Sequence, residues 1–209
     1  MTDDCAAVMM ELVQGEGGVN VLEESYVKAV AQECKKRDIL LVIDEVQTGN
    51  GRTGKMYCYE HYDIKPDIVT TAKGIGGGLP IGAVLFGEKT ENTLSYGTHG
   101  STFGGNPICA AGAVSIVERL DDELFEEVTK KGEYIKTELL KLPKVKSVSG
   151  KGLMLGIETE IPAADVVSKC LEKGLMVLTA KNKVRLLPAL NIPMELIEKA
   201  LAIISEILE

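Results

Sequence analysis

Several features that mark other classes of protein are missing from this sequence. Residues 1–20 contain no lysine or arginine, so no secretory signal is expected. The longest apolar runs, such as residues 39–43 and 81–86, are far too short to cross a bilayer. We therefore expect a cytoplasmic protein without a membrane role.

Residues that bind metals are also scarce. The only two histidines, His61 and His99, lie far apart, and the five cysteines occur singly with no C-x-x-C pair. Zinc sites need clustered histidine and cysteine ligands, so no metal site is expected. Buried, reduced thiols are the better interpretation of the cysteines.

Positive charge is in deficit, because 23 lysines and arginines face 31 acidic residues, for a net charge of −8. Nucleic-acid backbones recruit basic surfaces, so a nucleic-acid partner is not expected. A small phosphorylated ligand needs only a local group of donors and is compatible with this charge. The 209 residues, 45% hydrophobic and 26% charged, suit a globular protein of one or two domains.

The first half of the chain alternates apolar runs with a helical pattern, which is typical of an α/β sheet with parallel strands. Residues 40–46 are continuously apolar up to Asp44 and Glu45, as in a strand buried on both faces. The expected strands cover residues 6–13, 40–46, 67–73 and 81–87, with a helix over 23–36 between the first two.

After a glycine-rich stretch ending near Pro107, helical patterns dominate. A last amphipathic helix follows Pro193, a favourable residue for a helix start. We expect a large-domain part over residues 1–111 and a smaller α+β domain over 112–209. From residue 107 onward, the predicted helices lie near 107–120, 122–140 and 163–173, and the predicted strands near 153–158, 175–179 and 184–187.

Two nucleotide-binding motifs match residues 49–55 formally. The dinucleotide pattern G-x-G-x-x-G needs its first glycine directly after a strand and an acid at the end of the next strand. Here residues 45–48 intervene, and the next strand ends at Lys73. The phosphate-loop pattern G-x-x-x-x-G-K needs Ser or Thr where Met56 stands, so neither motif is favoured.

Asp44 and Lys73 each end a predicted strand of the same sheet, where ligands of α/β proteins bind. The pair alone also fits an exposed ion pair of little energetic value. A glycine-rich run over 74–78 follows Lys73 and would let a planar group approach the backbone. Pyridoxal phosphate requires an amine, an acid and anion donors, and residues 99–102 could supply the donors.

Three stretches carry a resemblance to a known family, the class III (subgroup II) aminotransferases. They are 44–54 (DEVQTGNGRTG), 66–74 (PDIVTTAKG) and 99–107 (HGSTFGGNP). The resemblance implies the α/β fold of PLP-dependent transferases of fold type I, with a partial large-domain sheet followed by an α+β small domain. It also implies pyridoxal 5′-phosphate as the cofactor.

The resemblance further implies roles in cofactor binding for five residues. Lys73 would hold the cofactor covalently and move the substrate's proton, and Asp44 would pair with the pyridine nitrogen. Val46 would pack against the ring, and Gln47 would reach its phenolic oxygen. Glu45 belongs to the same cofactor-binding segment.

Substrate and partner contacts follow from the resemblance as well. Ser101 would contact the substrate, and Thr102 would bind the cofactor phosphate of the partner subunit, so a homodimer is expected. Glu16 would pair with Arg185 as a gate that lets one pocket accept both an amino-acid donor and a dicarboxylic 2-oxo acid.

Each of these side chains also has an ordinary structural interpretation. Glu16 fits a solvated loop acid, and Arg185 fits a strand residue that extends to the surface. Ser101 and Thr102 fit turn residues, and Gln47 fits a cap on a backbone group.

Within the family, residues 51–54, 59–62, 74–83 and 177–180 are most similar to the acetylornithine type. This similarity implies transfer of the δ-amino group of N-acetylornithine to 2-oxoglutarate, a step of arginine biosynthesis. Ornithine, succinylornithine and 4-aminobutyrate transaminases are the alternatives within the family. Members are about twice as long as this chain. A truncated, non-catalytic fragment is therefore the alternative from another class of function.

Overall fold

The structure, a computed structural model, describes all residues 1–209, and its chain forms two compact units. The first unit consists of Met1–Leu12, Leu22–Asn50 and Lys55–Asp121, and the second of Val13–Val21, Gly51–Gly54 and Asp122–Glu209. The units divide after helix α2 (Pro107–Val117), whereas the predicted domain boundary at 111/112 lies inside that helix.

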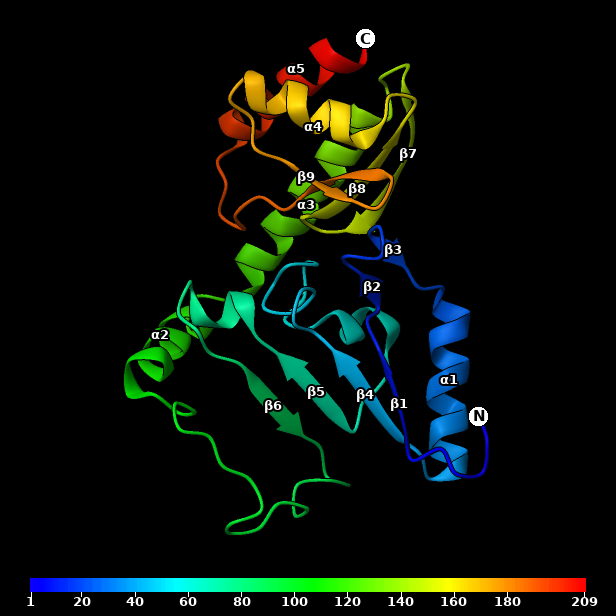
Figure 1. Ribbon diagram of the computed structural model, residues 1–209, viewed down its shortest axis with the longest axis vertical. Coiled ribbons are helices and arrows are strands. Elements are labelled where there is room, and N and C mark those ends of the chain that lie inside the picture. The colour runs from blue at the N-terminus through cyan, green and yellow to red at the C-terminus, as the bar shows by residue number, and fades with distance from the viewer. The chain divides into compact units, whose positions relative to one another are not determined.

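The first unit contains a four-stranded sheet in the order β1-β4-β5-β6 (Figure 1). Strands β1 (Ala7–Met10), β4 (Leu40–Asp44) and β5 (Ile68–Thr71) are parallel, which confirms the predicted α/β class. Strand β6 (Ala83–Phe86) runs antiparallel to β5, so the prediction of parallel strands is wrong there. The connection of residues 72–82 holds only a short 3-10 turn, too little for the crossover that a parallel neighbour needs.

The core of this sheet lies in β4. Its three central residues, Leu41, Val42 and Ile43, are buried, as the continuously apolar sequence predicts. Helix α1 (Glu24–Arg37) packs beside the sheet with Val27 and Cys34 buried. It has Glu24 in its first turn and three basic residues in its last, which suits the helix dipole.

Strand β6 has no buried residue, although its sequence, Ala-Val-Leu-Phe, is wholly apolar. Val84 is 51% exposed and Phe86 is 39% exposed. The next element along the chain, α2, is also largely exposed, with Ile108 and Val114 facing solvent. An edge strand with both faces uncovered is unusual in a soluble protein.

The second unit contains an antiparallel sheet in the order β7-β8-β10-β9. The strands are β7 (Val145–Lys151), β8 (Met154–Thr159), β9 (Leu178–Ala180) and β10 (Lys183–Leu186). The helices α3 (Asp122–Leu139), α4 (Ala163–Glu172) and α5 (Met194–Leu208) confirm the predicted helices within a few residues. Strand β7 was not predicted.

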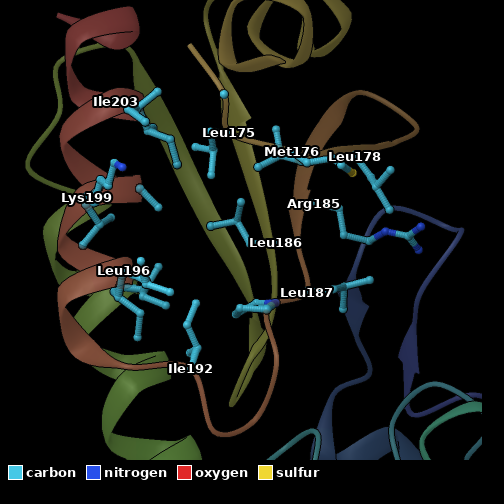
Figure 2. Close-up of a pocket in the computed structure, with 18 residues that line it drawn as sticks. Leu175, Met176, Leu178, Arg185, Leu186, Leu187, Ile192, Leu196, Lys199 and Ile203 are labelled. Carbon is cyan, nitrogen blue, oxygen red and sulfur yellow. The ribbon is translucent and has the colours of Figure 1, made fainter. Parts of the chain in front are cut away.

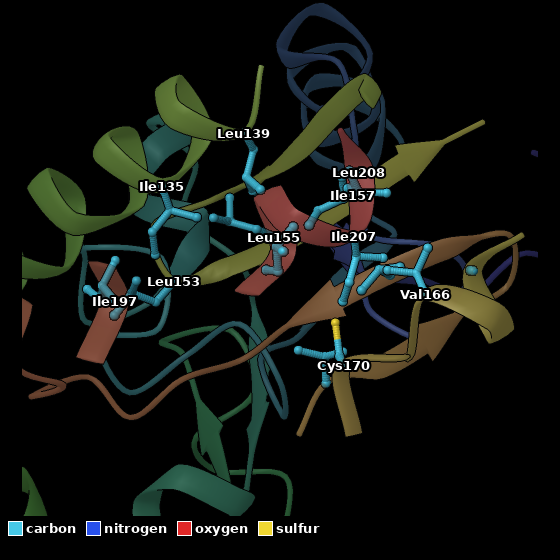
Figure 3. Close-up of a cluster of buried hydrophobic side chains, with 14 of the residues drawn as sticks. Ile135, Leu139, Leu153, Leu155, Ile157, Val166, Cys170, Ile197, Ile207 and Leu208 are labelled. Atoms are coloured by element: carbon cyan, nitrogen blue, oxygen red, sulfur yellow. The ribbon is translucent and has the colours of Figure 1, made fainter. Parts of the chain in front are cut away.

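The hydrophobic core of the second unit joins these helices to the sheet (Figure 3). Leu139 of α3, Val166 of α4 and Ile204 of α5 contribute to it together with Leu155 and Ile157 of β8. Alternate strand residues and helix residues at 3.6-residue spacing therefore meet in a single apolar layer.

A short hairpin, β2 (Val13–Gln14) with β3 (Asn20–Val21), belongs to the second unit. The predicted strand over 6–13 is therefore wrong in its extent, because the chain leaves the first sheet after Met10. Val19 in the hairpin turn is fully buried with φ +52°, a strained conformation for a β-branched residue. A Cβ on Gly156 of β8 would lie 2.8 Å from Val19 Cβ, so the turn packs closely on the sheet.

The five thiols are free, and all but Cys5 are buried. The expected burial is confirmed for these four cysteines and is wrong for Cys5, which is half-buried. None of the helices combines the length and apolar character needed to span a bilayer.

Candidate active site

The strongest candidates from the sequence, Asp44 and Lys73, follow neighbouring parallel strands. Asp44 is the last residue of β4 and is in register with Thr70 of β5. Lys73 begins the 3-10 turn η2 (Lys73–Gly76) directly after β5. Both residues therefore lie at the carboxyl edge of the same sheet, the position at which α/β folds bind ligands.

Asp44 is half-buried, and one of its carboxylate oxygens already accepts a hydrogen bond from the chain. Its Oδ1 accepts a hydrogen bond from the backbone N–H of Val46 at 2.9 Å. This contact turns the chain after β4 and fixes the orientation of the carboxylate. The second oxygen, Oδ2, is left for a ligand.

Lys73 is exposed and has a left-handed backbone with φ +47°. Such a conformation is strained for lysine and is typical of functional sites. Its ammonium group makes neither an ion pair nor a hydrogen bond. The turn that follows reaches Gly77 with φ +58° and Gly78 with φ +102°, so glycine is required for the backbone there.

Glu45 is fully buried, and its carboxylate accepts hydrogen bonds from nearby residues of the same chain. Thr48 Oγ1 donates to Oε2, and the backbone N–H of Tyr59 donates to Oε1 at 2.9 Å. Burial raises the pKa of Glu45, and these hydrogen bonds partly oppose the rise. Glu45 thus shapes the turn from which Val46 and Gln47, both half-buried, project.

Asn50 is a residue that the sequence reasoning missed. Its side chain is 4% exposed, and its Nδ2 donates to Thr71 Oγ1 at 2.9 Å, just before Lys73. Its Oδ1 is buried without a hydrogen-bond partner, as is Oγ1 of Thr70. The Asn-Gly dipeptide at 50–51 could have indicated the left-handed turn, because these residues favour positive φ.

Ser101 and Thr102 lie in an exposed segment between β6 and α2. Because β6 is antiparallel, it ends beside Ile68 at the amino end of β5. Figure 1 shows the chain running on from this end of the sheet and then leading into α2. Ser101 Oγ accepts a hydrogen bond from the backbone N–H of Gly104 at 3.0 Å, and neither Ser101 nor Thr102 is hydrogen-bonded to Lys73.

Glu16 and Arg185 meet within the second unit. Arg185 on β10 is 7% exposed, and its Nη1 donates to Glu16 Oε1 at 2.7 Å. Its Nε is buried without a hydrogen-bond partner. A nearly buried guanidinium with spare donors is well suited to bind a carboxylate in two-point geometry.

A mostly apolar pocket of about 550 Å³ lies in the second unit beside β10 and α5 (Figure 2). Leu186 points toward α5, whereas the Arg185 side chain points to the other side of the strand. The walls of the pocket include Leu175, Met176, Leu186, Leu196 and Ile203. Polar groups are few, so we assign it no chemistry.

These groups define what the site can do chemically. An amine without a partner, an oriented carboxylate and a glycine-rich turn lie at one edge of the sheet in the first unit. This first set suits covalent attachment of a carbonyl compound through an amine. The second unit, taken by itself, holds a nearly buried guanidinium paired to an exposed acid, which suits recognition of an anionic group.

Comparison with known proteins gives a consistent result. The family model "Aminotransferase class-III" matches residues 1–208. The acetylornithine aminotransferase of Haemophilus ducreyi is 49% identical over 99% of this chain and 53% of that protein. That of Aquifex aeolicus is 47% identical over 100% of this chain and 55% of that protein. The chain spans about half the length of the curated relatives it matches.

Solved structures match over the same extent. The ornithine δ-aminotransferase of Plasmodium falciparum matches with a TM-score of 0.88 and 41% identity, over 98% of this chain and 56% of that chain. The N-acetylornithine aminotransferase of Stenotrophomonas maltophilia matches with a TM-score of 0.89 and 35% identity, again over 98% and 56%.

Proposed function

The chain belongs to the class-III aminotransferase family, and on this premise we propose that it carries the lysine-bearing half of an acetylornithine-type transaminase. The proposed reaction transfers the δ-amino group of N-acetylornithine to 2-oxoglutarate, in arginine biosynthesis and in the cytoplasm. The observation that carries the proposal is the placement of Asp44 and Lys73 at the ends of adjacent parallel strands.

Pyridoxal 5′-phosphate is the cofactor of this family, and the residues at the sheet edge fit it. Lys73 has an amine without a partner, and Asp44 has a carboxylate oxygen free for a ring nitrogen. Of the glycines at 74–78, only Gly78 has open space around an added Cβ, whereas Gly76 and Gly77 are closely approached by neighbouring side chains. Two buried polar atoms without partners, on Thr70 and Asn50, lie beside the same strand end.

When bound, the cofactor supplies an electron sink for the carbon that bears the amino group. Lys73 would bind the cofactor covalently through Nζ and then move a proton to and from that carbon. Asp44 would hold the proton on the ring nitrogen, because a carboxylate nearby favours the positively charged ring. Val46 and Gln47, set by the turn that Glu45 stabilises, would orient the ring.

Arg185 would bind the carboxylate of the substrate, and Glu16 would neutralise it when that carboxylate is absent. The nearly buried guanidinium and the high exposure of Glu16 support this gate. Because Glu16 is largely exposed, an anionic substrate can reach the pair from the solvent side and compete for the arginine.

A homodimer is part of the proposal. Thr102 lies in the exposed segment between β6 and α2 and makes no hydrogen bond to Lys73 of its own chain. A partner subunit could instead use Thr102, together with Ser101, to bind the phosphate and the substrate.

Two alternatives have support of their own. Ornithine aminotransferase is favoured by the match to the Plasmodium falciparum enzyme at 41% identity. A non-catalytic fragment is favoured by the uncovered strand β6. Succinylornithine and 4-aminobutyrate transaminases lack a specific observation in their favour.

The first prediction concerns Lys73. Purified 209-residue protein mixed with pyridoxal phosphate should absorb in the visible range, and borohydride followed by peptide mapping should find a single adduct on Lys73. Lys73→Ala should remove this adduct, because no other lysine follows β5 beside an oriented carboxylate.

Lys55→Ala is the matched control, since Lys55 is exposed as well and should leave the adduct intact. An adduct on Lys73 would justify transaminase assays with N-acetylornithine and ornithine, which separate the two substrates. Labels scattered over surface lysines would contradict the proposal that this chain alone holds the cofactor.

A further inference from the structure

Asn50 occupies an unusual position within the loop that follows β4. Its backbone is left-handed with φ +56°, and its side chain is almost fully buried. Asparagine tolerates this conformation better than other residues with a side chain. Glycine would satisfy the backbone equally well, so the buried amide needs a separate explanation.

The amide of Asn50 contacts the two residues that precede Lys73. Its Nδ2 donates to Thr71 Oγ1 at 2.9 Å and makes a longer contact of 3.4 Å with the carbonyl oxygen of Ala72. On the other side of the lysine, a Cβ added to Gly74 would lie 3.3 Å from Asn50 Cβ, so Asn50 limits the space beside this residue. Asn50 therefore holds the chain before the lysine by hydrogen bonds and lies close to the residue after it.

The backbone at Lys73 needs such support, because the Lys73 side chain makes no hydrogen bond or ion pair that would fix it. Its left-handed conformation persists only if neighbouring groups determine it. Strand β5 ends at Thr71, so the hydrogen bonds of the sheet stop two residues before Lys73. Beyond the strand, the carbonyl oxygen of Ala72 accepts from the Asn50 amide and, at 3.3 Å, from the backbone N–H of Ile75.

The unpaired oxygen of Asn50 strengthens this argument. Oδ1 is buried without a hydrogen-bond partner, which costs free energy that an apolar side chain would avoid. The contacts made by Nδ2 are the only interactions that could compensate for this free-energy cost. Such orphaned polar atoms are rare in proteins and call for a functional explanation.

We propose that Asn50 is a positioning residue, which holds the Thr71–Gly74 backbone so that the amine of Lys73 is presented to the carbonyl group of the cofactor. The role of this positioning in cofactor binding rests on the proposed function. The contacts by which Asn50 holds the chain do not depend on it. Asn50 itself touches neither the cofactor nor the substrate in this role.

The test compares Asn50→Gly in two backgrounds. Glycine keeps the left-handed backbone and removes the amide. In otherwise unchanged protein, the affinity for pyridoxal phosphate at equilibrium should fall about tenfold, the change expected for one hydrogen bond of ordinary strength. In the Lys73→Ala background, Asn50→Gly should leave the remaining affinity unchanged, because its effect passes through the lysine.

An equal loss of affinity in both backgrounds would overturn the proposal, since Asn50 would then act on the cofactor or on the whole fold. Thr71→Val, which removes the acceptor Oγ1 and preserves the shape, should give a smaller loss with the same dependence on Lys73. No effect of either variant in the presence of Lys73 would also contradict the proposal.

A second measurement works without cofactor. Amide hydrogen exchange of residues 72–77 should be faster in Asn50→Gly, while exchange in β4 stays unchanged. If unaltered protein forms no adduct but this exchange is faster, the proposed function fails and the bracing stands without its chemical purpose. Unchanged exchange would overturn the bracing itself.

Discussion

At the scale of single residues, two adjacent acids show how one strand end serves two purposes. Asp44 is half-buried and presents an oxygen at the sheet edge, whereas Glu45 is fully buried and binds Thr48 and Tyr59. Neighbouring residues in an extended chain point to opposite faces, so the two carboxylates meet different surroundings. The second acid builds the turn that orients the first.

This difference predicts a pH dependence for Glu45→Gln. Burial raises the pKa of Glu45 above its ordinary value of 4.5, so the folded state binds the proton more tightly than the unfolded state. The stability of the natural protein should therefore fall as the pH rises from 4.5 through the raised pKa. Glutamine does not titrate, so the variant should gain relative stability over this range, by about 1.4 kcal/mol per unit of pKa difference.

Urea denaturation at a series of pH values from about 4.5 to 8 would measure this difference in the free energy of unfolding. Thr48→Val, which removes the donor and keeps the acid, should retain the fall with pH. Parallel curves for Glu45→Gln and the natural protein would mean that Glu45 does not titrate in this range.

The sequence alone could identify Asp44 and Lys73 as a pair, because an acid and an amine each ended an apolar run. It could not identify Asn50, since its partners lie 21 and 22 residues further along the chain. Such a contact depends on how two loops meet at the sheet edge. Periodicity within one segment carries no information about it.

At the scale of elements, helix α3 depends on a close approach to the backbone. A Cβ added to Gly132 would lie 2.2 Å from the carbonyl oxygen of Gly152, in the turn between β7 and β8. Neither group is a flexible side-chain end that could give way. The glycine therefore sets how closely the helix packs on this hairpin.

Gly132→Ala should consequently destabilise the second unit, although alanine normally favours a helix by about 1 kcal/mol. Overpacking typically costs about 1–3 kcal/mol, so the clash should exceed the gain in helix propensity. Thermal and urea unfolding would measure the change. Glu133→Ala, on the exposed neighbouring residue, should be close to neutral, and a stabilised Gly132→Ala would contradict the close approach.

Element boundaries also show what local sequence can predict. Helix α5 was predicted because its apolar residues recur at helical spacing after Pro193. Strand β7 was not, because Lys146, Ser147 and Ser149 weaken its apolar alternation and the register shifts between Val145 and Ser147. The direction of β6 could have been read from the short connection before it.

At the scale of the whole molecule, the uncovered strand β6 predicts self-association of the 209-residue protein. An apolar edge strand with unpaired backbone groups is a template for strand pairing. Val84→Lys should lower the apparent mass in sedimentation experiments, because a charge on an edge strand opposes such pairing.

Leu171→Lys is a matched control, since Leu171 is 61% exposed on α4 in the second unit. It should leave the association unchanged. An equal effect of both substitutions would indicate that net charge, and not the edge of the sheet, governs the association.

The second unit draws residues 13–21 and 51–54 from early in the chain, so the two units are interleaved in sequence. A cut at the Asp121–Asp122 bond would therefore not yield two self-sufficient pieces. The later piece would lack Glu16, the partner of Arg185, and Arg52, whose guanidinium donates to the carbonyl oxygens of Leu153 and Pro188. If the gene is split at that point, we expect the two pieces to fold only together, by fragment complementation, and not as independent domains.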